Sequence, residues 1–376
     1  MVWESSSNCD KAETFDVDAD VASEGSFKAD FEAATAKLGL ENVCPFVAAS
    51  SSLVAEDSEE VTESVRVTNC KIDRASWRAM LLAAIATGCK VNEICVVGCE
   101  LTPGHVEDLC KALGKLCTIG SVKMDYISFS PTEPVEGAAQ AEEGEQSPSP
   151  ASSLVQLLGP ALGLSYVSLK GCGFTPREGA AIAEALPLAP CLSALNLSAN
   201  QLMDAGMQAV LKAASLAPAL QYLSLAHNKS ESFRFVVTAG ELLFGRRKDD
   251  GDDAVLAAGA ASVSTYNKGL KDLGKKRKKA GLDDLPEMVA AEGRVCAVTL
   301  GEEEGVELVV HRGLRHVDLS GTGVADTATK DALSALVRAQ KDVFGDDKPL
   351  ECTLALGGLG IIAGAALNAP GLVLKA

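Results

Sequence analysis

Residues that commonly carry out catalysis do not occur in catalytic arrangements in this sequence. The four histidines, His105, His227, His311 and His316, are scattered, and no Cys/His constellation with metal-ligand spacing is evident. The sequence contains no G-x-S-x-G, no P-loop and no H-E-x-x-H motif, so the signatures of the common hydrolase and phosphate sites are missing. We therefore predict a protein that is not an enzyme, with no metal, no cofactor and no small-molecule substrate.

Two short motifs resemble ligand loops but lack required residues. The segment from Gly358 to Ala363 has the glycine spacing of a dinucleotide-binding turn, but no following strand or acidic residue comes after it. The segment from Asp16 to Asp20 has the alternating carboxylates of a calcium loop, but Val21 and Phe27 replace its glycine and glutamate. We interpret the acidic segment as solvated surface.

Tyrosine, histidine and charged residues at repeated positions are the candidates for binding. Tyr166 and Tyr222 occupy the same place in two similar segments, and His316 occupies that place in a third. Tyrosine is enriched in binding hot spots, but exposed strand positions also favour it for its β propensity alone. Both interpretations stay open, and the candidate partner-binding residues are Asp125, Tyr126, Tyr166, Lys170, Tyr222, His227, His316 and Asp318, with Lys123 and Arg315 beside them.

A repeated leucine pattern predicts the elements that position these residues. Segments of the form L-x-x-L-x-L-x-x-N/C-x-L begin at Leu164, Leu192 and Leu220, at a constant interval of about 28 residues. Related segments begin at Thr62, Val91 and Ile119, at nearly the same interval, and the pattern returns at Leu314. Within each segment the apolar residues alternate, which predicts a strand with one buried face.

A helix is predicted after each strand. Thr102-Pro103 and Thr175-Pro176 are typical helix starts, because threonine caps the amino terminus and proline suits the first turn. Each unit is then one strand and one helix, and neither can bury its apolar face alone. Stacking of neighbouring units buries these faces and makes stability a sum over layers and their interfaces. Cys70, Cys99 and Cys172 occupy the Asn/Cys position, where we expect a packing role.

The alternation of two nearly equal repeat lengths, together with the Asn/Cys position, resembles the ribonuclease-inhibitor-like subfamily of leucine-rich-repeat proteins. The resemblance covers Thr62 to about Leu225 well and Leu314 to Ala376 less closely. It implies an α/β leucine-rich-repeat solenoid, a horseshoe with a parallel concave β-sheet and convex helices, interrupted by long loops. The subfamily includes enzyme inhibitors, Ran GTPase-activating proteins, innate-immune receptors, actin-capping proteins and ciliary regulatory subunits.

The chain is predicted to divide into two parts. Residues 1–61 form an acidic segment outside the repeats, in which Phe27 to Leu40 is a candidate capping helix. Residues 62–376 form the repeat domain, with loop insertions at about 131–150 and 229–294. The first insertion is rich in Pro, Ser and Glu and cannot bury a core, and it is followed by a predicted helical stretch from Ser153 to Leu162. Shorter matches at Val295 to Leu300 and Leu354 to Leu356 are candidate repeat strands.

The charge balance bears on the partner. A formal net charge of −17 disfavours a specific nucleic-acid partner, since phosphate binding needs excess Lys and Arg. One strongly basic cluster lies within 268–279 and includes Lys275, Lys276, Arg277, Lys278 and Lys279. It is open to interpretation as a nuclear-import signal, a contact to acidic lipid or to acidic protein tails, or an exposed loop that offsets the acidic charge.

Twelve cysteines without a C-x-x-C pair are typical of reduced thiols inside cells. Together with an amino terminus unlike a secretory signal, they predict a cytoplasmic protein, with cytoskeletal, ciliary or nuclear placement as alternatives. The uncharged stretch from Cys352 to Leu374 favours a final repeat over a membrane anchor, because Asn368 and Pro370 interrupt it.

The predicted function is a non-enzymatic protein-interaction scaffold or regulatory subunit that uses the concave repeat face within a larger assembly. Two alternatives remain. One is a GTPase-activating protein similar to the Ran regulator, and the other is a tail-anchored membrane adaptor.

Overall fold

The structure is a computed structural model of the chain, and it describes part of the residues. Residues 131–149 of the loop predicted at about 131–150, the turn at 358–363 and most of residues 1–61 lie outside the described residues. The described residues are 16, 26–41, 63–87, 91–116, 119–129, 150–159, 163–189, 191–217, 219–230, 234–244, 246–279, 295–300, 306–311, 314–322, 353–355 and 372–373.

The chain folds into two compact units. Unit 1 comprises Met1–Leu157 and Leu162–Cys172, and unit 2 comprises Leu158–Ala161 and Gly173–Ala376. Each unit is built from parallel strands with helices packed beside them, which agrees with the predicted α/β class.

The strands of unit 1 pair in parallel at the spacing of the repeats. They are β1 (Glu63–Thr68), β2 (Val91–Val97), β4 (Ser121–Asp125) and β6 (Tyr166–Ser168), each paired with the next. Val65 pairs with Ile94, and Ile94 pairs with Val122, so the register repeats the intervals seen in the sequence. These side chains are all buried, which confirms the predicted buried face of the strands.

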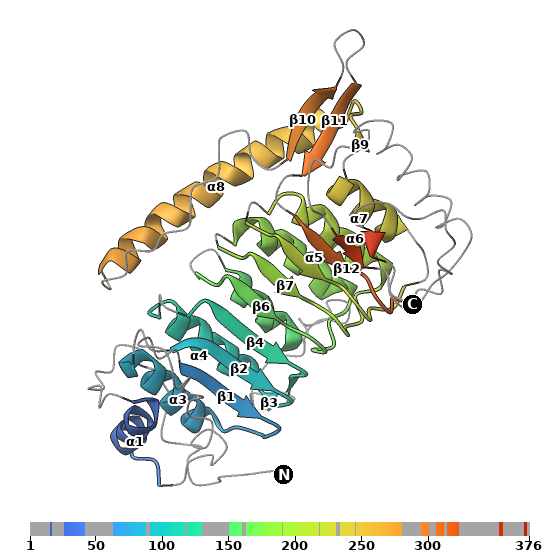
Figure 1. The fold of residues 1–376 in the computed structure, drawn as a ribbon. Coiled ribbons are helices and arrows are strands. Elements are labelled where there is room, and N and C mark those ends of the chain that lie inside the picture. The colour runs from blue at the N-terminus through green and yellow to red at the C-terminus, as the bar shows by residue number, and fades with distance from the viewer. Residues whose placement is uncertain are drawn as a thin grey trace, which may run out of the picture. The chain divides into compact units, whose positions relative to one another are not determined.

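Helices cover the buried face of the unit 1 strands (Figure 1). They are α3 (Arg74–Thr87), α4 (Pro103–Leu113) and the 3-10 helix η2 (Pro150–Leu158). η2 covers the first part of the helical stretch predicted at 153–162, of which 160–162 lie outside the described residues. The predicted capping helix forms as α1 (Phe27–Lys37), which buries Phe27 and Phe31 and packs against α3. Two short strands, β3 (Glu100–Leu101) and β5 (Ser128–Phe129), pair beyond the ends of β2 and β4.

Unit 2 is also built from parallel strands and helices. Its parallel strands are β7 (Ala194–Asn196), β8 (Tyr222–Ser224), β12 (His316–Asp318), β13 (Thr353–Ala355) and β14 (Leu372–Val373). Its first helices are α5 (Pro176–Ala185), η3 (Leu186–Leu188), α6 (Met203–Ala214) and α7 (Arg234–Phe244). The predicted strand at 354–356 is therefore confirmed within one residue, whereas β14 was not predicted.

The segment 229–294, predicted to be an irregular loop insertion, contains regular helices. α7 packs beside α6 as the helix of the β8 layer, and α8 (Asp252–Lys279) is a long helix after the two-residue strand β9 (Arg246–Arg247). The prediction was wrong because α8 is rich in alanine and lysine, so it forms a helix without the leucine pattern. Among the described residues, no helix has the combined length and apolar character needed to cross a bilayer.

The prediction of a repeat strand at 295–300 was also wrong. β10 (Val295–Leu300) pairs antiparallel with β11 (Val306–His311), which in turn pairs antiparallel with β9. The two longer strands are separated by only five residues, so local hairpin pairing replaces pairing with the parallel strands.

Candidate functional site

The Asn/Cys position of each repeat closes the turn that follows a strand. Asn228 donates from Nδ2 to the carbonyls of Leu197 and Leu225 at 3.0 and 2.9 Å, and its Oδ1 accepts from the Leu202 N–H. Cys172 donates from Sγ to the Met124 carbonyl at 3.0 Å in the equivalent place. These side chains satisfy buried backbone groups, so the position has the structural role that the sequence predicts.

The residue before this position turns the chain through a left-handed conformation. Asn69, Tyr126, Ala199 and His227 all have φ between 53° and 58°. The Tyr126 N–H donates to the Lys170 carbonyl at 2.6 Å, and the His227 N–H donates to the Ser320 carbonyl at 2.7 Å. This corner, which the sequence reasoning missed, places Tyr126 and His227 at the end of their strands with exposed side chains. Glycines at 98, 171 and 321 in the same column were the available signal.

A glycine in the next layer makes room for each corner ring. A Cβ added at Gly171 would lie 2.4 Å from Cδ1 of Tyr126, and one added at Gly321 would lie 2.2 Å from Nδ1 of His227. Lys170 Nζ lies 5.4 Å from the centre of the Tyr126 ring, within cation–π range. The Tyr126 ring is thus held in place although the residue is 50% exposed.

A polar cluster occupies the open face of the unit 1 strands. We call the residues Ser64, Glu93, Ser121, Lys123 and Tyr166 the unit 1 strand patch. Lys123 Nζ lies 2.5 Å from Glu93 Oε1, and Ser64 and Ser121 donate to the same carboxylate. Burial alone would raise the pKa of Glu93, but the hydrogen bonds from Lys123 and the serines lower it below its usual range. Lys123 Nζ also lies 5.7 Å from the centre of the Tyr166 ring.

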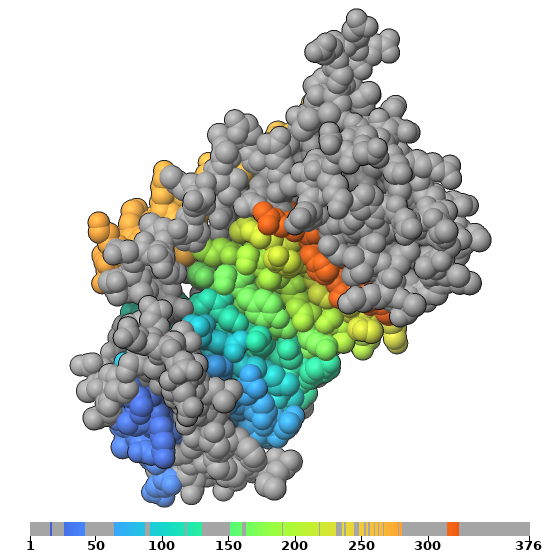
Figure 2. All heavy atoms as spheres, viewed as in Figure 1, coloured from blue at the N-terminus to red at the C-terminus, as the bar shows by residue number. Residues whose placement is uncertain are grey.

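An aromatic pair lies on the open face of the unit 2 strands. His316 and Ala194 each pair in register with Tyr222 on the neighbouring strands, so the three lie in one row as the sequence predicts. The Tyr222 and His316 ring centres are 6.2 Å apart, and Tyr222 is 49% exposed. We call Tyr222 and His316 the unit 2 aromatic pair. The atoms of β7, β8 and β12 form a surface open to view in Figure 2.

The two predicted aspartates also hold the backbone of their own layers. Asp125 accepts from Ser168 Oγ at 2.6 Å and from the Lys170 N–H at 3.0 Å. Asp318 accepts from the Ser320 N–H at 2.9 Å. Both carboxylates therefore fix the corner geometry, and a contact to a partner stays a prediction for them.

The structure distributes the candidate residues over the two units. Asp125, Tyr126, Tyr166 and Lys170 belong to unit 1, and Tyr222, His227, His316 and Asp318 belong to unit 2. The basic cluster from Lys275 to Lys279 lies in the last turns of α8, in unit 2.

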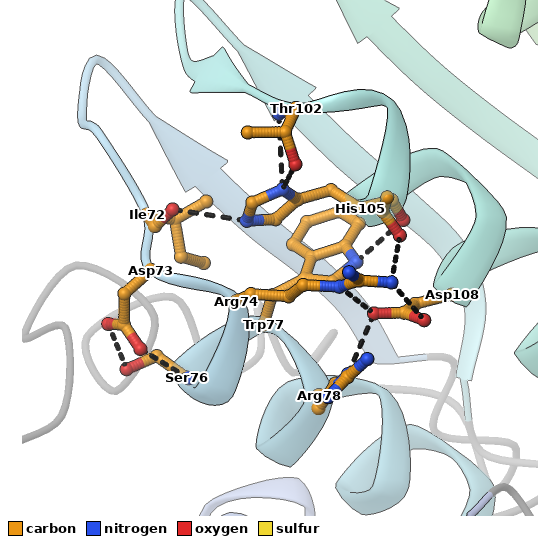
Figure 3. A network of polar contacts seen from close by, with 10 residues as sticks. Ile72, Asp73, Arg74, Ser76, Trp77, Arg78, Thr102, His105 and Asp108 are labelled. Carbon is orange, nitrogen blue, oxygen red and sulfur yellow. Dashed lines mark hydrogen bonds and ion pairs between the residues drawn. The ribbon is translucent and has the colours of Figure 1, made fainter. Parts of the chain in front are cut away.

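On the helix side of unit 1, His105 belongs to a hydrogen-bond network that the sequence did not predict (Figure 3). Its Nδ1 accepts from the Thr102 N–H at 3.1 Å, and its Nε2 lies 3.1 Å from the Ile72 carbonyl. Because Ile72 presents only an acceptor, Nε2 carries the proton and the ring is neutral. Burial lowers the pKa of His105 to about 4. His105 thereby fills, at the start of α4, the capping role of Glu178 at the start of α5.

A buried carboxylate joins α3 to α4 in the same network (Figure 3). Asp108 is 0% exposed and accepts from Arg74 Nε and Arg78 Nε, each at 2.8 Å. Burial would raise the pKa of Asp108, but the two arginines lower it below its usual range. Trp77 completes the packing by donating from Nε1 to the His105 carbonyl at 2.9 Å. Among the described residues, the buried side-chain nitrogen and oxygen atoms of this network all have hydrogen-bond partners, so the network serves the fold.

Two thiols of unit 1 are poor nucleophiles. Burial raises the pKa of Cys110 and of Cys172 to about 12, so both stay protonated at neutral pH. Within the described part of the chain, no group of three or more His, Cys, Asp or Glu side chains is placed to hold a metal ion.

Comparison with known proteins identifies no family. No protein-family model matches the sequence, and no curated protein matches it. Among solved structures, an internalin from Listeria monocytogenes aligns over 93% of this chain and 94% of its own, with 10% sequence identity and a TM-score of 0.21. A score this low places no constraint on the partner of this chain.

Proposed function

We propose that this protein is a leucine-rich-repeat protein of the ribonuclease-inhibitor-like type that binds a protein partner through its open strand faces. The observation that carries the proposal is the unit 2 aromatic pair, in which a half-exposed tyrosine stands beside a histidine on paired strands. Fixed aromatic side chains on a rigid sheet lose little entropy on binding, which makes them effective anchors.

The strand face is a better candidate for the partner surface than the helix face. In the helix-side network of unit 1, the side chains of His105 and Trp77 bond to backbone carbonyls, and Asp108 accepts from two arginines. On the strand side, Tyr126 and Tyr222 expose about half of their surface, and Arg66 is also exposed. A scaffold or regulatory subunit would present this face to another member of its assembly.

The proposal is tested by capture of partners from an extract of the source cells with quantitative mass spectrometry. The variants are Tyr222→Ala/His316→Ala and Tyr126→Ala/Tyr166→Ala. The control is Leu188→Ala, because Leu188 is 43% exposed but lies in η3, away from the strands. A partner captured by wild type and by the control should be lost at least about tenfold in a strand-face variant, since one anchoring tyrosine commonly contributes about 2 kcal/mol. If both strand-face variants keep every partner, the strand faces are not the binding surface.

A further inference from the structure

The basic cluster is a helical surface held in place by an apolar contact. Val263, Leu270 and Leu273 of α8 are buried, and Leu270 packs against Ala219 and Cys191 of unit 2. The side chains on the opposite side of α8 are exposed. They are Ser264, Thr265, Lys268, Lys271, Asp272, Lys275, Lys276, Lys278 and Lys279. We call the lysines of this set the α8 basic face.

The α8 basic face is short. A helix rises about 1.5 Å per residue, so Lys268 and Lys279 are separated by about 16 Å along the axis. An extended peptide rises about 3.3 Å per residue, so about five residues of such a peptide span the face. In Figure 1, α8 extends away from the β10–β11 hairpin, and its carboxyl-terminal end, which carries the lysines, is the end farther from this hairpin.

From this surface we infer a second binding site, on α8, for a short acidic segment of a partner protein. Six lysines and one aspartate on one helical face give a strongly positive local field, which is complementary to a run of Glu or Asp. This site is separate from the strand faces of the proposed function.

Two features disfavour a membrane as the occupant. An interfacial helix needs a free apolar face, but the apolar face of α8 is already buried against unit 2. A bilayer would also bring an extended anionic plane against a chain whose formal net charge is −17.

Nucleic acid is disfavoured for related reasons. Among the described exposed side chains of α8, none is an aromatic ring on which a base could stack. A long polyanion would extend beyond the short row of lysines and be repelled by a chain whose formal net charge is −17. A short acidic peptide avoids this repulsion, because charges more than about 8 Å apart are largely screened at physiological salt.

Replacement of Asp272 tests the inference by the direction of the change in affinity. It forms an exposed ion pair with Lys275 at 3.0 Å, and the hydrogen bond from Lys275 lowers the pKa of Asp272. Asp272 therefore stays charged and reduces the positive field of the face. Its replacement by asparagine should strengthen binding of an acidic peptide, whereas a merely structural role would predict no gain.

The experiment is fluorescence anisotropy of a labelled oligoglutamate peptide of about ten residues, with the full chain as titrant. Lys275→Glu/Lys278→Glu should weaken binding about tenfold or more, and Asp272→Asn should tighten it about twofold. The matched control, Lys212→Glu/Lys229→Glu, changes the net charge equally at exposed lysines elsewhere in unit 2 and should change affinity less than twofold. Circular dichroism checks that each variant is folded.

Several outcomes would overturn the site. These are no oligoglutamate binding by wild type, equal weakening in the control, or tighter α8-dependent binding of phosphatidylserine vesicles or of a short DNA duplex. The Tyr222→Ala/His316→Ala variant should bind oligoglutamate like wild type. Failure at α8 and failure of the strand-face proposal are therefore distinguishable.

Discussion

At the scale of single residues, the left-handed corner determines which side chains the end of each strand displays. Non-glycine residues adopt positive φ at a cost of about 1–2 kcal/mol, so the surrounding structure must maintain it. Here the corner N–H of Tyr126 and of His227 is bonded to the carbonyl of the next layer. The exposed rings are therefore fixed in direction by the backbone beneath them.

The contact between Gly171 and Tyr126 leads to a first prediction. Gly171→Ala adds a methyl group 2.4 Å from the Tyr126 ring at a φ of 66°, so both backbone strain and a displaced ring are expected. We expect a loss of about 2 kcal/mol in the free energy of unfolding, measured by chemical denaturation. Gly173→Ala is the control, because Gly173 has a φ of 75° but no atom within 4 Å of an added Cβ. An equal loss in the two variants would mean that the ring contact contributes nothing.

His105 leads to a prediction of pH dependence. Its pKa is lowered to about 4 in the folded protein, against about 6.5 in the unfolded chain. The unfolded state therefore binds more protons between these values. The stability due to neutral His105 is fully present above pH 6.5 and is lost as the pH falls through 4, by about 3 kcal/mol in total.

The measurement is the free energy of unfolding between pH 7 and pH 4 for wild type and His105→Gln. Glutamine keeps a capping-box side chain but does not titrate. The wild type should lose stability more steeply than the variant as the pH falls. Parallel curves would exclude His105 as the source of the slope.

At the scale of elements, the Asp108 ion pairs predict how α3 and α4 are joined. Asp108→Asn leaves the guanidinium of Arg78, which is 3% exposed, without its carboxylate. We expect a loss of about 3–5 kcal/mol in chemical denaturation, because an unpaired buried charge is costly. The double variant Asp108→Asn/Arg78→Met should recover a large part of this loss. No recovery would show that geometry rather than charge is the cause.

The repeat spacing predicts the elements well wherever the leucine pattern is intact. Register follows directly, because Val65, Ile94 and Val122 are each one repeat apart and pair across the strands. The pattern fails at α8, whose helix depends on alanine and lysine propensity and on burial of Leu270. The regular spacing of Leu256, Val263 and Leu270, two helical turns apart, was the available signal.

The candidate site is only partly predictable. The row of Tyr222 and His316 follows from the repeat frame, since equivalent positions in neighbouring layers must pair. The left-handed corner is harder to predict. Tyr126 and His227 adopt a positive φ there, a conformation that the sequence alone would predict only for glycine. The charged network of Asp108 depends on side-chain directions between two helices, which spacing does not specify.

At the scale of the whole molecule, a fold built from layers predicts that a core substitution destabilises mainly its own layer and the neighbouring layers. Leu223 of β8 is fully buried, and Leu223→Ala should cost about 2–5 kcal/mol in unit 2. Native-state hydrogen exchange should accelerate at the amides of β7, β8 and β12 and stay unchanged at β1 and β2. Uniform acceleration throughout the chain would instead indicate a single cooperative fold.

The alternation of corner residues constrains how this chain can lengthen or shorten over evolution. Asn69 lies over Gly98, with Oδ1 2.4 Å from where a Cβ would be, just as Tyr126 lies over Gly171. Excision of the single repeat that carries Gly98 would bring Asn69 against Tyr126, with no glycine to accept the Asn69 side chain. Excision or duplication of two consecutive repeats keeps every large corner residue next to a glycine. In unit 1, a repeat with a corner glycine can therefore be lost only together with a neighbouring repeat that has a large corner residue.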